Sequence, residues 1–246
     1  MNCLPIDLIQ YCIFDKLYFK TQIRFRKICK WLNRCKIHNM FYNIHIKYLN
    51  RLSDEILINY PKIKYLNASD NRKITNVTHM ANLQILNASG LYCGLGDNGI
   101  KNLNLIELNV RSNSKIKNIN HMTNLQILDA SYNYVLSDDG IKDLNLIKLN
   151  ASLNVNITNI NHMTNLQILD VSLNCGINDH GIKNLNLIEL NASCTPKITN
   201  INHMTNLQIL DASGCLSGID DNGIKNLNLI ELNSSYNEKI TKKLNH

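Results

Sequence analysis

The sequence predicts an α/β solenoid, a stack of short repeated units with a parallel β-sheet along one side. The phrase Asn-His-Met-Thr-Asn-Leu-Gln-Ile-Leu-Asp occurs without change at residues 120–129, 161–170 and 202–211. A second phrase, Gly-Ile-Lys-Asn-Leu-Asn-Leu-Ile-Glu-Leu-Asn, stands at residues 99–109, 181–191 and 223–233. Both phrases lead into one frame, Leu-x-x-Leu-x-(Ala/Val)-x-x-Asn. A unit of about 20 residues cannot bury its own apolar side, so neighbouring units are expected to stack.

Each unit contains one predicted strand. Apolar and polar residues alternate around Leu-x-(Ala/Val), which is the pattern of a strand with one buried face. The Leu and the Ala or Val are expected in the core, and the residues between them on the opposite face. The sequence predicts nine strands in one sheet, which begin near Ile63, Leu83, Leu105, Leu125, Leu146, Leu166, Leu187, Leu207 and Leu229.

The last position of the frame predicts a structural role for asparagine. Where a strand ends, backbone groups lose their strand partners, and an Asn amide both donates and accepts hydrogen bonds. A buried ladder along the stack is therefore expected. Its predicted members are Asn71, Leu91, Asn113, Asn133, Asn154, Asn174, Thr195, Cys215 and Asn237.

Two kinds of segment return the chain to the next strand. Ile157, Ile160 and Met163 are spaced by three, which suits a tight helical or 3₁₀ turn. In the alternate units a short apolar stretch follows Asp138 and Asp139, and we expect an Asp or Ser there to cap a short helix. The paired carboxylates also suit a cation, but no third ligand lies near them in the sequence.

The frame and its spacing resemble the leucine-rich repeat. The resemblance covers residues 63–246, about nine units. It implies a horseshoe whose parallel sheet lies on the concave face. It also implies a binding function, and we expect that the protein is not an enzyme.

The predicted concave face carries the candidate partner-binding residues. A second outward strand position is Asn or Asp throughout, and a third is Ser except at Arg111. Exposed isoleucine on every second strand favours a protein-binding surface, although duplication of the repeat would also produce it. The position before the ladder varies and adds Tyr132 and Tyr236, against the alternative of unconstrained loop drift. The first outward position contributes Tyr65, Ile85, Glu107, Ile127, Lys148, Ile168, Glu189, Ile209 and Glu231.

Residues 1–41 do not fit the frame and are predicted to form a small helical module. Apolar residues recur at helical spacing over residues 8–17 and again over residues 25–32. So short a piece makes a poor independent core, so it must pack on the repeats or on another protein. Residues 42–62 copy the return segment of a repeat at Ser53, Asp54 and Glu55, and are predicted to be a degenerate capping repeat.

The N-terminal module resembles an F-box. It opens with Leu-Pro and a carboxylate at residues 4–7 and closes with an apolar residue, Cys, a basic residue and Trp at residues 28–31. It departs from the pattern by one extra residue before Leu17 and by a shorter spacing between Cys29 and Trp31. An F-box followed by these repeats resembles the F-box/LRR family, whose members recognise substrates for SCF-type cullin ubiquitin ligases. The resemblance implies that the ligase adaptor, and through it the cullin scaffold, is bound by Leu4, Pro5, Leu8, Ile9, Ile28, Cys29 and Trp31.

A second interpretation stays open. The chain is then a stand-alone interaction or inhibitor protein whose N-terminal helices only cap the first repeat. Under both interpretations no catalytic, metal or cofactor site is expected, because no Gly-rich phosphate loop, nucleophile motif or H-E-x-x-H occurs. One histidine recurs in each block, but two-strand spacing separates these side chains by ~10 Å, too far to share a metal: His79, His121, His162 and His203.

Charge and cysteine usage limit the partners and the compartment. The net charge is +7, and residues 1–62 hold the whole excess of Lys and Arg. A basic helix there suits an acidic protein partner better than nucleic acid, so no nucleic acid is expected. The eight cysteines show no pairing framework, and no apolar run is long enough to span a bilayer. We therefore expect an intracellular protein, cytoplasmic or nuclear, with no membrane partner.

Overall fold

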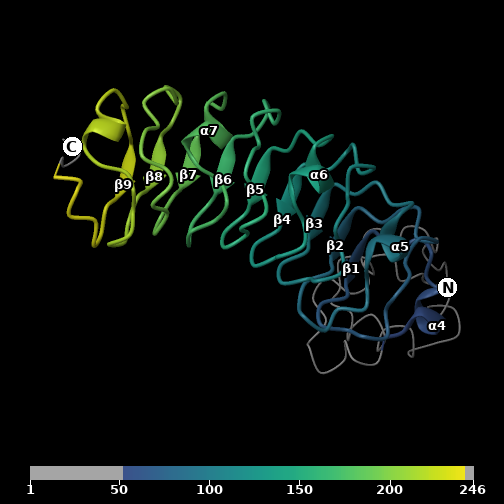
Figure 1. Cartoon of the computed structure of the whole chain (residues 1–246). Helices are drawn as coiled ribbons and strands as arrows, with labels where there is room; N and C mark the ends of the chain where they lie inside the picture. The colour runs from purple at the N-terminus through teal and green to yellow at the C-terminus, as the bar shows by residue number, and fades with distance from the viewer. Residues whose placement is uncertain (1–51, 242–246) are drawn as a thin grey trace, which may run out of the picture.

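The computed structural model describes residues 52–241. The predicted F-box-like module, with all its adaptor-binding residues, and residues 42–51 of the predicted capping repeat lie outside the described residues. Nine short strands form one parallel sheet in chain order, and the stack of units curves along its length (Figure 1). The strands are β1 (Tyr65–Asn67), β2 (Ile85–Asn87), β3 (Glu107–Asn109), β4 (Ile127–Asp129), β5 (Lys148–Asn150), β6 (Ile168–Asp170), β7 (Glu189–Asn191), β8 (Ile209–Asp211) and β9 (Glu231–Asn233).

The sheet pairs equivalent residues of neighbouring units. Leu128 of β4 lies opposite Leu108 of β3 and Leu149 of β5, and the other strand pairs follow the same register. The side chain of Leu128 is 1% exposed and that of Ala130 is fully buried. The predicted strand positions and their buried face are therefore confirmed. Because every unit uses the same register, side chains of one kind form continuous rows along the stack.

The segment before β1 and the segments that follow β2, β4, β6 and β8 each contain one turn of helix. A Cβ at Gly140 would lie 2.1 Å from the carbonyl oxygen of Lys117, so only glycine allows this close approach to the preceding unit. The helices are α4 (Asp54–Leu57), α5 (Asp97–Ile100), α6 (Asp138–Ile141), α7 (Asp179–Ile182) and the 3₁₀ helix η3 (Asn222–Ile224).

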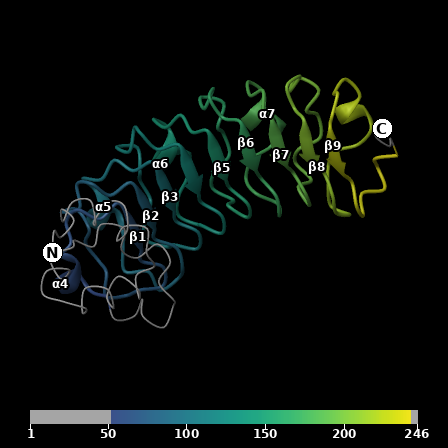
Figure 2. The ribbon, with the colours of Figure 1, turned by 180° about the vertical axis from the view of Figure 1, so that it is seen from behind.

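The segments that lead from β1, β3, β5 and β7 to the next strand contain hydrogen-bonded turns in place of a helix. Met163 N donates to Ile160 O and Leu166 N donates to Met163 O, each at 3.0 Å. Ile157, Ile160 and Met163 are fully buried, as their spacing predicts. Figure 2 shows these returns from behind, along the length of the sheet.

The expected side-chain cap is wrong for Asp138. Asp138 is the first residue of α6, and Ser137 before it forms no side-chain capping bond. The carboxylate instead accepts hydrogen bonds from Thr158 of the next unit. A side-chain cap does form in α7, where Asn178 accepts from the Gly181 N–H at 3.1 Å. The Asp138 carboxylate thus joins two units, a contact that the sequence alone does not reveal.

The asparagine ladder is confirmed in the units whose loops carry no extra residues, where the buried asparagines are Asn71, Asn113, Asn133, Asn154 and Asn237. Asn133 is fully buried; its amide donates to Val110 O at 3.1 Å and accepts from the N–H groups of Val135 and Leu136. Each such amide ties the end of a strand to the preceding unit. Thr195 forms one of these bonds to the preceding unit, since its hydroxyl donates to Val171 O at 2.7 Å.

Three predicted ladder members are wrong. Leu91 is 66% exposed, and Cys93, two residues later, is buried with its Sγ 3.5 Å from Ala68 O. Extra residues in these loops shift the buried position along the chain. For the same reason Cys175 replaces the exposed Asn174, and Ser217 replaces the exposed Cys215.

Candidate functional site

From β2 to β8, two consecutive residues of each unit project from the sheet, between two buried leucines. At β5, Leu146 and Leu149 are fully buried, whereas Ile147 and Lys148 between them are exposed. The N–H groups of Ile147 and Lys148 both donate to Gln126 O, at 2.9 and 3.0 Å. Two donors on one carbonyl resemble a β-bulge, which turns both side chains to the same face.

The outward pairs place one isoleucine on every unit from β2 to β9. On β2, β4, β6 and β8 it is the first strand residue, and on β3, β5, β7 and β9 it is the residue just before the strand. The isoleucines therefore alternate between two adjacent rows and form a zigzag across the strands. This isoleucine zigzag consists of Ile85, Ile106, Ile127, Ile147, Ile168, Ile188, Ile209 and Ile230.

The structure brings together the predicted isoleucines and others that sequence reasoning missed. Ile209 is 36% exposed and Leu210, next to it, is 1% exposed, so the predicted outward side is confirmed there. Ile106, Ile147 and Ile188 were not predicted, although each is 37% exposed. Their signal was present in the repeated Leu-Ile-Glu-Leu, where two core leucines leave both residues between them outside.

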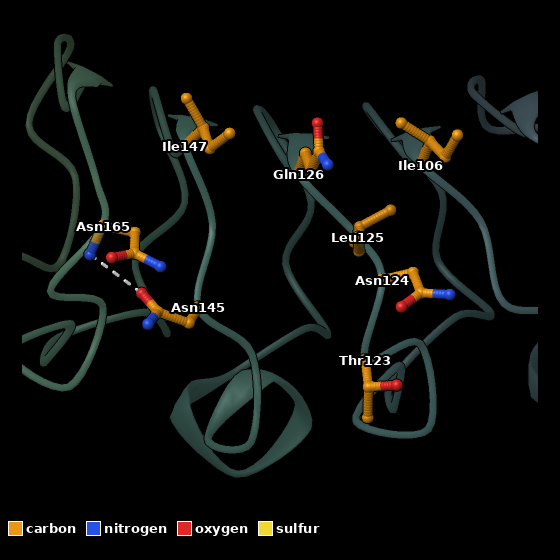
Figure 3. Close-up of a pocket in the computed structure, with 8 residues that line it drawn as sticks. All are labelled: Ile106, Thr123, Asn124, Leu125, Gln126, Asn145, Ile147 and Asn165. Atoms are coloured by element: carbon orange, nitrogen blue, oxygen red, sulfur yellow. Dashed lines mark hydrogen bonds between the residues drawn. The ribbon is translucent and has the colours of Figure 1, made fainter.

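A shallow hollow of about 400 Å³ borders the zigzag between β3 and β6 (Figure 3). Ile106, Gln126 and Ile147 project along its upper side in this view, and three asparagines line its lower side. Asn165 N donates to Asn145 Oδ1 at 3.0 Å, so this asparagine edge is held in place by contacts between units. The lining residues are Ile106, Thr123, Asn124, Leu125, Gln126, Asn145, Ile147 and Asn165.

The outward Asn or Asp row supports the strand ends. Asp129 Oδ1 accepts from Ser131 N at 3.0 Å, and Asn150 Oδ1 accepts from Ser152 N at 2.9 Å. Aspartate and asparagine therefore accept the same backbone hydrogen bond at this position. They differ in charge and in the amide donor, which Asn191 and Asn233 direct to Asp170 and Asp211, so the row can vary in charge while the backbone bond is kept. Ser131 and Ser152 are themselves buried, which removes much of the third predicted outward row from the surface.

The residue just after the third row has a left-handed backbone in all nine units. Its φ is +54° at Tyr132, +53° at Leu153 and +62° at Tyr236, and glycine stands there twice. Left-handed backbone costs a non-glycine residue about 1–2 kcal/mol, so the varied side chains are not chosen for the turn. The full column is Asp70, Gly90, Ser112, Tyr132, Leu153, Leu173, Cys194, Gly214 and Tyr236.

The predicted Tyr132 and Tyr236 lie in this left-handed column, and the predicted Arg111 directly precedes it; the column together with Arg111 is called the rim. The Arg111 guanidinium stacks on the Tyr132 ring, 4.6 Å from its centre, as Arg72 does on Tyr92 at 4.3 Å. Tyr236 is 87% exposed. Because Arg111 belongs to the Ser row and Tyr132 and Tyr236 to the left-handed column, the rim is a second surface, separated from the isoleucine zigzag by the Asn or Asp row.

Metal and thiol chemistry have little support within residues 52–241. No group of three or more His, Cys, Asp or Glu side chains is placed to hold a metal ion there. Each repeated histidine instead places Nε2 near a backbone carbonyl of the preceding unit, as His121 does at 3.2 Å from Ile100 O. Burial raises the pKa of the Cys93 and Cys175 thiols to about 11. No helix in this part of the chain is long and apolar enough to cross a bilayer.

Comparisons with known proteins add structural similarity alone. No family model matches the chain, and no curated protein does. An internalin (InlF) from Listeria monocytogenes is similar in structure, with 21% identity, 87% of this chain and 77% of that chain covered, and a TM-score of 0.49. TLR13 in the TLR13–ssRNA13 complex shares 17% identity over 77% of this chain and 38% of that chain, with a TM-score of 0.39. The parallel register, the buried Leu frame and the asparagine ladder define the described part as a solenoid of the leucine-rich-repeat kind.

Proposed function

We propose that this chain is a non-catalytic protein-binding module whose contact surface is the isoleucine zigzag. The observation that carries the proposal is one outward isoleucine per unit over eight neighbouring strands, of which five are exposed and three (Ile85, Ile127 and Ile168) are half-buried. Single exposed isoleucines are ordinary, but a continuous exposed apolar row on a monomer is typical of an interaction surface. The flanking rows are polar, as is usual at the rim of a protein interface.

Affinity capture with the full chain tests this proposal. A variant with Ile127, Ile168 and Ile209 changed to Ser removes half of the apolar row from β4 to β9, and the expected result is loss of the captured partner. The matched control changes Thr164 and Thr205 to Ser, because these exposed side chains precede β6 and β8 outside both the zigzag and the lining of the hollow. Unchanged capture by the isoleucine variant would place the contact elsewhere.

We propose a finer role as the substrate-recognition subunit of an SCF-type cullin ubiquitin ligase. Support comes from the resemblance of residues 4–9 and 28–31 to an F-box, followed by a repeat surface suited to a substrate. Coprecipitation with the ligase adaptor tests it. Binding is expected for the natural chain and is expected to fall when Pro5 and Leu8 are changed to Ala and Lys. No binding under conditions in which a known F-box binds would remove this role.

The competing role is a stand-alone interaction or inhibitor protein. Deletion of residues 1–41 separates the two roles. If these residues only cap the first repeat, their removal exposes the core beside Leu52 and Leu57, and the repeats lose solubility. If they dock on an adaptor, the repeats stay folded and still bind substrate, while adaptor binding is lost.

A further inference from the structure

The isoleucine zigzag lies within an acidic face. From β4 to β9 the outward strand positions include one cation, Lys148, and five carboxylates. From β1 to β3 the outward positions, with the residue before each strand, carry the cations Lys64 and Arg111 and one carboxylate, Glu107. The acidic character is therefore confined to one end of the sheet, and its carboxylates are Asp129, Asp170, Glu189, Asp211 and Glu231.

Three of these carboxylates repeat with the same spacing as Ile127, Ile168 and Ile209, which share their strands. Asp129, Asp170 and Asp211 lie on every second strand, so they are separated by roughly 10 Å along the sheet. Each accepts a backbone N–H through Oδ1, which holds the carboxylate in place. Within residues 52–241 none of the three forms an ion pair. Asp170 Oδ2 also accepts from Asn191 Nδ2 at 3.3 Å, and Asp211 Oδ2 accepts from Asn233 Nδ2 at 3.0 Å. The negative charges are thus fixed in position by neutral donors and have no cationic partner among the described residues.

A partner that lies across the strands must offer the same chemistry about every 10 Å. An α-helix does so with each heptad, because seven residues rise about 10.5 Å. A β-strand covers that distance in about three residues, which places successive contacts on opposite sides of the strand. A polyproline helix also has a suitable period, but it binds aromatic-lined grooves, and the outward positions of β4–β9 beside the zigzag carry no aromatic residue.

We infer that the β4–β9 face binds a basic amphipathic α-helix of a partner protein. The helix lies across the strands, with its aliphatic stripe on the isoleucine zigzag and one Lys or Arg per heptad near Asp129, Asp170 and Asp211. This inference rests on the proposed protein-binding function and names the chemistry of the partner. Apolar contact supplies most of the affinity, and the carboxylates select a basic helix over an acidic one.

Fluorescence anisotropy with the full chain and defined peptides tests the inference. The probe is a labelled helical peptide of three heptads with Leu at the apolar positions and one Lys per heptad facing the carboxylates. Its matched partner carries Glu in place of Lys. The basic peptide is expected to bind more tightly, and its affinity is expected to fall as salt is raised. Equal binding of the two peptides, or stronger binding of a proline-rich peptide with Lys at every third residue, overturns the inference.

Variants of the chain supply the second arm. Changing Asp129, Asp170 and Asp211 to Asn copies what the alternate units carry, so the fold is kept and the affinity is expected to fall roughly tenfold. The control changes Asp139, Asp143 and Glu238, which are exposed outside this face, to amides, with the same change in net charge and no expected loss.

The outcomes distinguish this inference from the proposed function. If the Ile127, Ile168 and Ile209 variant loses peptide binding while the aspartate variant does not, the apolar surface stands and the basic partner is wrong. If neither variant changes binding, both fail. Competition by an unlabelled peptide of residues 1–41 at equal concentration would assign the face to the basic segment of this chain and overturn the partner helix.

Discussion

Asp138 of one repeat holds Thr158 of the next through both carboxylate oxygens. Oδ1 accepts from Thr158 N at 2.7 Å, and Oδ2 accepts from Thr158 Oγ1 at 2.6 Å. Asp179 repeats the arrangement with Thr199 at 2.8 and 2.6 Å. The α6 carboxylate is therefore a bond between units, and the paired carboxylates Asp138 and Asp139 have separate surroundings.

Replacing Asp138 with Ala should lower the free energy of unfolding by about 1–3 kcal/mol, because hydrogen bonds to a charged group are lost and backbone N–H groups are left unpaired. Asp139→Ala is the matched control, since its side chain is exposed and should change stability by no more than about 0.5 kcal/mol. Urea denaturation followed by circular dichroism measures both. Equal effects of the two substitutions would contradict the bond between units.

Replacing Ile127, Ile168 and Ile209 together with Ser should leave the fold intact. Partly exposed side chains contribute little to stability, about 0.5 kcal/mol each. Leu128→Ala, in contrast, should cost about 2–5 kcal/mol because it opens a cavity in the core. Thermal melts compare the two proteins. A loss in the triple variant as large as that of the leucine control would show that the isoleucines support the core.

The Ser217 hydroxyl is buried, and within the described chain its oxygen has no hydrogen-bond partner. Ser217→Ala should therefore leave the stability unchanged or raise it by about 1 kcal/mol, because an unsatisfied buried polar group is removed. Thr195→Val is the comparison, since its hydroxyl donates to Val171 O and its removal should cost about 1 kcal/mol. Denaturant midpoints measure the opposite signs; a clear loss in Ser217→Ala would reveal a partner for the hydroxyl.

Buried cysteines should react more slowly with an alkylating reagent than exposed cysteines. The pKa of the Cys93 and Cys175 thiols is raised to about 11 by burial, so both stay protonated at pH 8 and form thiolate only when the pH approaches that value. Cys215 is exposed and should react with iodoacetamide at pH 8 before Cys93 and Cys175 do. Peptide mapping by mass spectrometry follows each site, with a denatured sample as the fully reactive control. Rapid labelling of Cys175 in the folded chain would contradict its place in the ladder.

Loop length limited the prediction of the ladder. Counting from the strand leucine placed Asn174 in the core, yet Asn174 is exposed with a φ of +55°, and Cys175 is fully buried. One or two extra residues project from a loop at little cost, whereas the buried position must stay beside the preceding unit. Residue identity favoured Asn174, but distance from the neighbouring unit decides which residue is buried.

The amino-acid sequence alone determined the strands, their register and their buried leucines. Alternation with a period of two leaves one side for the core, and a shift of one residue would bury every polar side chain. The tertiary structure alone decided that Asp138 bonds to Thr158 of the next unit, and that Ile106 and Ile147 align with Ile127 between their strands in one zigzag. The flanking leucines already predict that Ile106 and Ile147 point outward, but the bond and the alignment depend on contacts between residues about 20 positions apart, where neighbouring units meet.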